Sequence, residues 1–132
     1  MLLPGMVPDI RTFNGASGWT SDWPDMAGLV AFGYDWLGRL YALDIDGVWM
    51  GAEAVVRFSP GTGDVEASTS PSTKLDEYLF DLLPKHKREW LSQDYFDDWR
   101  RASGKSLAPS ECAAYSVPLQ LGGVDDVPNL EV

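Results

Sequence analysis

The pair Asp44 and Asp46 is the arrangement in this sequence that best suits chemistry, because two carboxylates one residue apart can hold a divalent cation. The glycine that follows permits the sharp turn that such a loop needs. A calcium-binding loop of the EF-hand type also requires further acids and a glutamate at its twelfth position. Apolar residues occupy the corresponding positions here, namely Val48, Met50 and Val55. We therefore predict a turn at a hairpin end and no metal, with a metal-dependent enzyme on this pair as the alternative.

The remaining reactive side chains lack the partners that catalysis requires. His86 is the only histidine and lies among lysines and an arginine, with no nucleophile motif beside it. Cys112 is followed by two alanines, and we interpret it as a small buried hydrophobic residue. Asp97 and Asp98 are neighbours, and neighbouring helical side chains point about 100° apart, so they form no catalytic dyad. With no phosphate-binding or zinc-protease motif either, we predict no enzymatic activity and no cofactor.

A chain of 132 residues fits one domain, and its single cysteine cannot form a disulfide within the chain. The lack of paired cysteines favours a reducing compartment. No run of about eighteen apolar residues could cross a membrane, and the first residues lack the regions of a signal peptide. We therefore expect a cytoplasmic protein that does not contact membranes.

Charge is unevenly distributed along the chain, whose net charge is −10. Residues 74–105 carry seven bases and seven acids, whereas the rest carries thirteen acids and three bases. Nucleic acid is excluded as a partner because phosphate binding needs basic patches. An acidic surface attracts a basic protein, although solubility alone would explain the same charge.

Residues 29–45 form the predicted centre of the fold, a β-hairpin with a tight turn. The first arm, 29–34, is apolar and aromatic, and the second, 39–45, alternates between two faces. The turn begins with Asp35, which can bond its own backbone, and ends with Gly38, which tolerates positive φ. A third strand is predicted at 54–58 and a fourth at 64–67, joined by a turn at 60–63.

Two helices are predicted after the strands. The first, 73–83, has one apolar stripe and ends before Pro84, because the residue before a proline leaves the α region. The second, 92–102, begins with Ser92 as N-cap and is followed by Gly104. Its predicted buried face consists of Tyr95, Phe96, Trp99 and Ala102.

Both ends of the chain are less regular. Residues 1–28 show no periodicity, and we expect an irregular segment anchored by Trp19 and Trp23. Residues 115–121 read as a strand at a sheet edge, because Pro118 donates no hydrogen bond, and 129–132 as the start of another element. Together these patterns predict a single α+β domain over 29–132, an antiparallel sheet with two to three helices packed on it.

Three stretches resemble a known family when taken in order. They are FGYDWLGRLYALD at 32–44, FSPGTGDVE at 58–66, and CAAYSVPLQLGG at 112–123 followed by 129–131. The chain resembles the C-terminal domain family of type VI secretion immunity proteins, which is related to SUKH-type immunity domains. The resemblance covers roughly the last hundred residues and leaves 1–28 unmatched. It implies a SUKH-like fold and an immunity protein that binds and neutralises a toxin effector.

The charge pattern supplies the candidate binding residues and the kind of partner. A basic toxin, with a nuclease as the favoured class, would meet the acids outside 74–105, most of which lie in loops. Trp36 is a candidate aromatic anchor, as are Trp19 and Trp23. The predicted partner-binding residues are Asp22, Asp25, Asp35, Trp36, Asp44, Asp46, Asp64, Glu66, Asp125 and Asp126. The alternative is a general protein-interaction or regulatory domain of the same fold without a toxin partner.

Overall fold

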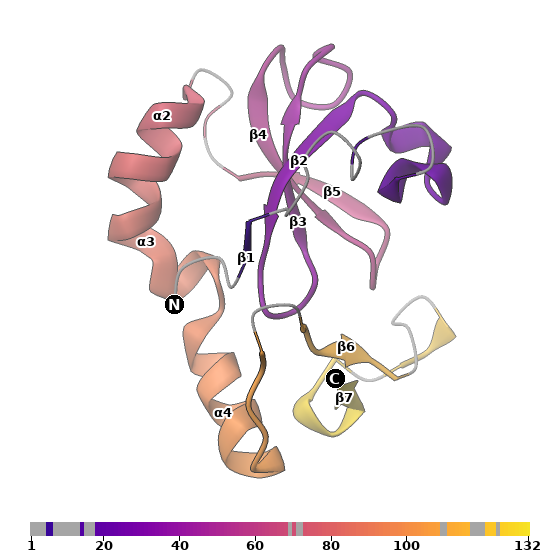
Figure 1. The fold of residues 1–132 in the computed structure, drawn as a ribbon, viewed down its shortest axis with the longest axis vertical. Helices are drawn as coiled ribbons and strands as arrows, with labels where there is room; N and C mark the ends of the chain where they lie inside the picture. The colour runs from indigo at the N-terminus through magenta and orange to yellow at the C-terminus, as the bar shows by residue number, and fades with distance from the viewer. Residues whose placement is uncertain are drawn as a thin grey trace.

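The hairpin predicted at residues 29–45 lies at the centre of the sheet in the structure, a computed structural model (Figure 1). The structure describes residues 5–6, 14, 18–68, 70, 73–108, 111–116, 121–123 and 125–132. The main sheet is antiparallel with its strands in chain order: β1 (Gly5–Met6), β2 (Leu29–Tyr34), β3 (Leu40–Asp44), β4 (Ala54–Ser59) and β5 (Asp64–Ala67). Four of these strands are longer than two residues, and the predicted positions of all four are confirmed.

A β-bulge in β2 changes the face of the sheet to which the last residues of that strand point. The register of β2 and β3 shifts between Ala31 and Gly33, which leaves Phe32 between two paired positions. Its side chain joins Tyr41 and Val55 in the core beneath the helices. The bulge therefore turns Tyr34 to the opposite face, where it packs against the core that contains Leu29 and Phe58.

The other face of the sheet is covered by residues from the start of the chain. The core here is built from strand residues such as Leu29, Val56 and Phe58. Two short 3-10 turns, η1 (Trp19–Ser21) and η2 (Pro24–Met26), lie over it, and the rings of Trp19 and Trp23 are centred 5.6 and 5.0 Å from the Phe58 ring. The two tryptophans thus anchor this segment, as the sequence predicts.

The first helix is longer than predicted and does not end at Pro84. It runs from α2 (Leu75–Glu77) through the π-helical η3 (Tyr78–Leu82) into α3 (Leu83–Trp90). In the π turn the N–H of Leu83 donates to the carbonyl of Tyr78, five residues back. This restarts the hydrogen-bond ladder, so Pro84 falls in the first turn of α3, where a missing N–H costs little.

The second helix, α4 (Gln93–Ser103), matches the prediction apart from its start and its last buried residue. Gly104 has φ +68° and its N–H donates to the carbonyl of Arg100, as expected of a helix C-terminus. Ser92 adopts a left-handed conformation and makes no side-chain cap. Phe96 and Trp99 are buried and Tyr95 is half-buried, but Ala102, in the last turn of α4, is exposed.

A third core joins the hairpin turn to α4 and to the C-terminal residues. It contains Trp36, Phe96, Trp99 and Ala113. The strand predicted at 115–121 overlaps β6 (Ala114–Tyr115) only at Tyr115; Ser116 and Leu121 are not in a strand, and residues 117–120 lie outside the described part of the chain. Strand β6 pairs with β7 (Leu130–Glu131), just after η5 (Val127–Asn129), and these strands form a two-stranded sheet separate from the main one. Among the described residues, no helix is both long and apolar enough to cross a membrane.

Candidate protein-binding site

The carboxylate of Asp35 is buried in the turn between β2 and β3 and is fully satisfied. One oxygen accepts from the backbone N–H groups of Leu37 at 3.0 Å and Arg39 at 3.1 Å. The other accepts from Arg39 Nε at 2.6 Å and from the hydroxyl of Tyr41 at 2.9 Å. Burial, together with the negative charge of Asp35, raises the pKa of Tyr41, so this hydroxyl stays protonated.

The same turn is joined to the helices by two side chains that follow Asp35 in the sequence. Arg39 Nη2 donates to Ser92 Oγ at 3.3 Å, and the indole N–H of Trp36 donates to the carbonyl of Leu91 at 2.9 Å. Asp35 and Trp36 are 0% exposed. They were predicted as partner-binding residues, but they hold the hairpin turn against the junction of α3 and α4 and present no surface to a partner.

Asp44 is also 0% exposed, at the opposite end of the sheet, and it binds only backbone. Its oxygens accept from the N–H groups of Val48 at 3.1 Å, Trp49 at 2.9 Å, Met50 at 2.8 Å and Gly51 at 3.3 Å. Burial by itself would raise the pKa of this carboxyl, but the four donors outweigh burial and hold the pKa below its usual value. Asp44 therefore orders the loop and, like Asp35, is not part of the exposed surface.

The loop that Asp44 holds, residues 45–53, carries exposed apolar side chains. Ile45 is 43% exposed, Val48 71% and Trp49 37%. Sequence reasoning missed these residues. The signal that could have found them is a valine and a tryptophan between an Asp-Gly turn and a glycine, where polar loop residues are usual.

The other seven predicted binding residues are exposed, but three of them also have bonding roles within the fold. Glu66 pairs with Arg57 across β4 and β5. Asp125 accepts from the hydroxyl of Tyr115, and Asp126 accepts from the N–H that begins η5. The remaining four are Asp22, Asp25, Asp46 and Asp64.

Residues 74–105 form the helical segment. Outside it, every exposed charged side chain in the described part of the chain is acidic. Arg39 and Arg57 are the bases there, and both are half-buried and paired with acids. Ten exposed acids remain on this part of the protein: Asp22, Asp25, Asp46, Glu53, Asp64, Glu66, Glu111, Asp125, Asp126 and Glu131. All the exposed bases of the described residues lie within 74–105.

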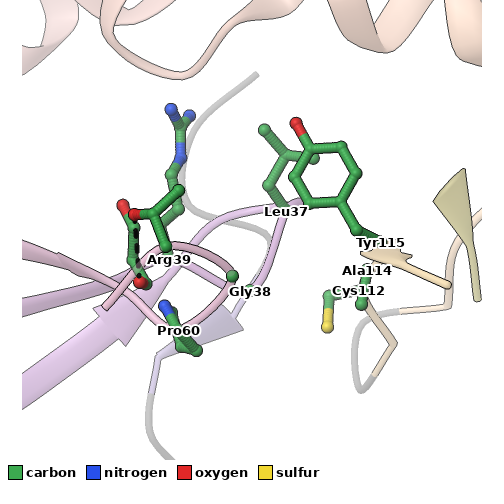
Figure 2. A pocket seen from close by; sticks show the side chains of 10 residues that line it. Leu37, Gly38, Arg39, Pro60, Cys112, Ala114 and Tyr115 are labelled. Atoms are coloured by element: carbon green, nitrogen blue, oxygen red, sulfur yellow. Dashed lines mark hydrogen bonds between the residues drawn. The ribbon is translucent and has the colours of Figure 1, made fainter. Parts of the chain in front are cut away.

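A pocket of about 290 Å³ lies at the end of the sheet opposite Asp44. Figure 2 shows Arg39 and Pro60 on one side and Cys112, Ala114 and Tyr115 on the other. Burial and the charge of Asp35 raise the pKa of the Cys112 thiol, which keeps it protonated and a poor nucleophile. The pocket therefore offers mainly apolar surface, with a protonated thiol at one side.

Metal coordination has no clustered ligands in the part of the chain that the structure describes. No three His, Cys, Asp or Glu side chains gather there in a way that could hold an ion. The lone pairs of Asp44 that face the loop are taken by N–H donors, and Asp46 is exposed beside Gly28.

Comparisons of the chain with protein-family models, curated proteins and solved structures find no match.

Proposed function

We propose that this chain is a cytoplasmic bacterial immunity protein with a SUKH-like domain, which binds a basic toxin effector and thereby neutralises it. The observation that carries the proposal is the charge of the surface: ten exposed acids and no exposed base on the described residues outside 74–105. The sequence resemblance to type VI secretion immunity domains supplies the class of partner, and the α+β fold is compatible with it.

Electrostatics explains how such a surface would act on a toxin. A field of one sign steers an oppositely charged protein and raises the association rate. A nuclease binds phosphate with a basic active site, so an acidic protein can occupy that site as a substrate decoy. The chain would then inhibit by binding, without chemistry of its own.

The experiment starts by isolating the partner from the source cells on immobilised protein. The association rate of the purified pair is then measured at low and at physiological salt for the wild type, D22K/D25K and the matched control E77K/E89K. All four acids are exposed, and both double variants change the charge equally, but Glu77 and Glu89 lie in the neutral helical segment. We expect added salt to slow association by at least about tenfold and D22K/D25K to slow it more than the control.

Co-production in bacteria tests inhibition directly. Cells that make the partner should stop growing, and wild-type protein should restore growth. A partner without net positive charge, an association rate that ignores salt, or a partner that is harmless to cells would overturn the proposal.

A further inference from the structure

The loop of residues 45–53 is the most apolar exposed segment of the described chain. It contains three of the six large hydrophobic side chains exposed there, Ile45, Val48 and Trp49. Exposed apolar residues gathered in one short segment, and rimmed by polar ones, mark sites of protein interaction. Met50, between them and the sheet, packs into the core over β2–β4 and fixes the base of the loop.

Hydrogen bonds make this loop rigid before any partner arrives. The Asp44 carboxylate holds four consecutive N–H groups, and the Asp44 carbonyl accepts from the N–H of Glu53 at 2.7 Å. Gly47 has φ +69°, and a Cβ there would lie 2.8 Å from the backbone nitrogen of Ala52. A loop ordered in advance loses little conformational entropy on binding.

The loop and the segment bonded to it are acidic. Asp46 and Glu53 lie within the loop, Asp25 lies on η2, and Asp22 directly follows η1. The N–H of Ile45 donates to the carbonyl of Gly28 at 3.2 Å, which joins the loop to the segment after η2. Residues 18–28 and 45–53 contain no lysine or arginine.

We propose that this loop is the hot spot for the basic protein partner, with Trp49 and Val48 entering an apolar pocket that lysines or arginines surround. The inference rests on the proposed function and names its contact surface. A few aromatic and aliphatic anchors inside a polar rim supply most of the energy of an interface. The acids contribute the approach and the orientation, since exposed pairs add little affinity.

The test uses phage-displayed random peptides selected on the full chain, since these report the preferred chemistry of the surface. Selected peptides are synthesised and titrated against the wild type, W49A, V48S and E77K/E89K. We expect peptides that combine Lys or Arg with an aliphatic or aromatic residue. Each loop variant should weaken their binding by about tenfold or more. The helix variant should weaken it less than about threefold, because pairs on the rim of an interface are worth little.

Amide chemical shifts of the protein locate the peptide. Shifts at 45–53 together with the loss in W49A support the inference. The inference would be overturned if W49A or V48S bound the peptides within about twofold of the wild type, or if the shifts were confined to 114–131. The proposed function would still stand in that case, provided that the selected peptides are basic. Peptides without basic residues would overturn the proposed function itself. A dimer in sedimentation that V48S dissociates would overturn the inference in favour of a second copy.

Discussion

Asp35 comes shortly before strand β3 and Asp44 is its last residue, and both carboxylates are fully buried. Asp35 is bonded by the side chains of Arg39 and Tyr41 as well as by backbone, and the junction of α3 and α4 covers it. Asp44 is bonded by backbone N–H groups alone, and the loop around it exposes apolar residues to solvent.

The difference separates a structural end of the sheet from an end suited to binding. At the Asp35 end, chain segments far apart in sequence meet, and the polar groups satisfy one another within the fold. At the Asp44 end, the carboxylate orders a loop that exposes Ile45, Val48 and Trp49 to solvent. An aspartate in a hairpin turn can thus serve either the core or a surface, depending on what packs over it.

The largest effect on stability is expected from D35A, which removes the buried carboxylate at the end of the sheet that the helices cover. It removes the nearest acceptor of the half-buried Arg39 charge and of the Tyr41 hydroxyl, which keep only longer bonds to Trp90 and Ser92. Losing one partner of a buried pair costs about 3–5 kcal/mol. Urea unfolding measures this loss, with D35N as the control that keeps the shape and one acceptor oxygen. A loss below about 1 kcal/mol would mean that the two ends do not differ as we describe.

A smaller loss is expected from D44A, about 1–3 kcal/mol in urea unfolding, because water can reach the loop amides that lose their acceptor. Hydrogen exchange of the amides at 48–51 should accelerate at the same time. D44N, which keeps one oxygen, should lie between D44A and the wild type. If D44A lost as much free energy of unfolding as D35A, the proposed difference between the two ends of the sheet would be wrong.

Acid should reduce the contribution of Asp44 in a predictable direction. Its pKa is lower in the folded protein than the value of about 3.9 in an unfolded chain, so its charged form stabilises the fold. That contribution is complete above the unfolded pKa and is lost as pH falls through the folded pKa. The difference in unfolding free energy between wild type and D44N should therefore be constant near neutrality and shrink below about pH 4. A difference that grows on acidification would contradict this assignment.

The smallest effect on stability is expected from V48S, in the loop at the Asp44 end of the sheet. Val48 is 71% exposed, so its replacement should change the free energy of unfolding by no more than about 0.5 kcal/mol. Thermal and urea unfolding measure this change. A loss above about 1.5 kcal/mol would show that the loop side chains are packed within the fold and not presented to a partner.

Elements whose causes are local could be predicted from the amino-acid sequence. The hairpin of β2 and β3, strands β4 and β5, and the end of α4 at Gly104 follow from alternation, turn residues and positive φ, all of which act over a few residues. The acidic surface of the described residues outside 74–105 could also be predicted, because acids outnumber bases in that part of the sequence and charged side chains are rarely buried.

Features that depend on partners far away in the sequence could not be predicted in this way. The helix continues through Pro84 because a π turn precedes it, whereas the Leu83–Pro84 pair by itself predicts that the helix ends there. Trp36 is a core residue because its indole reaches the carbonyl of Leu91, 55 positions away. Asp35 and Asp44 are buried because other segments of the chain pack over each end of β3, and no local pattern encodes that packing.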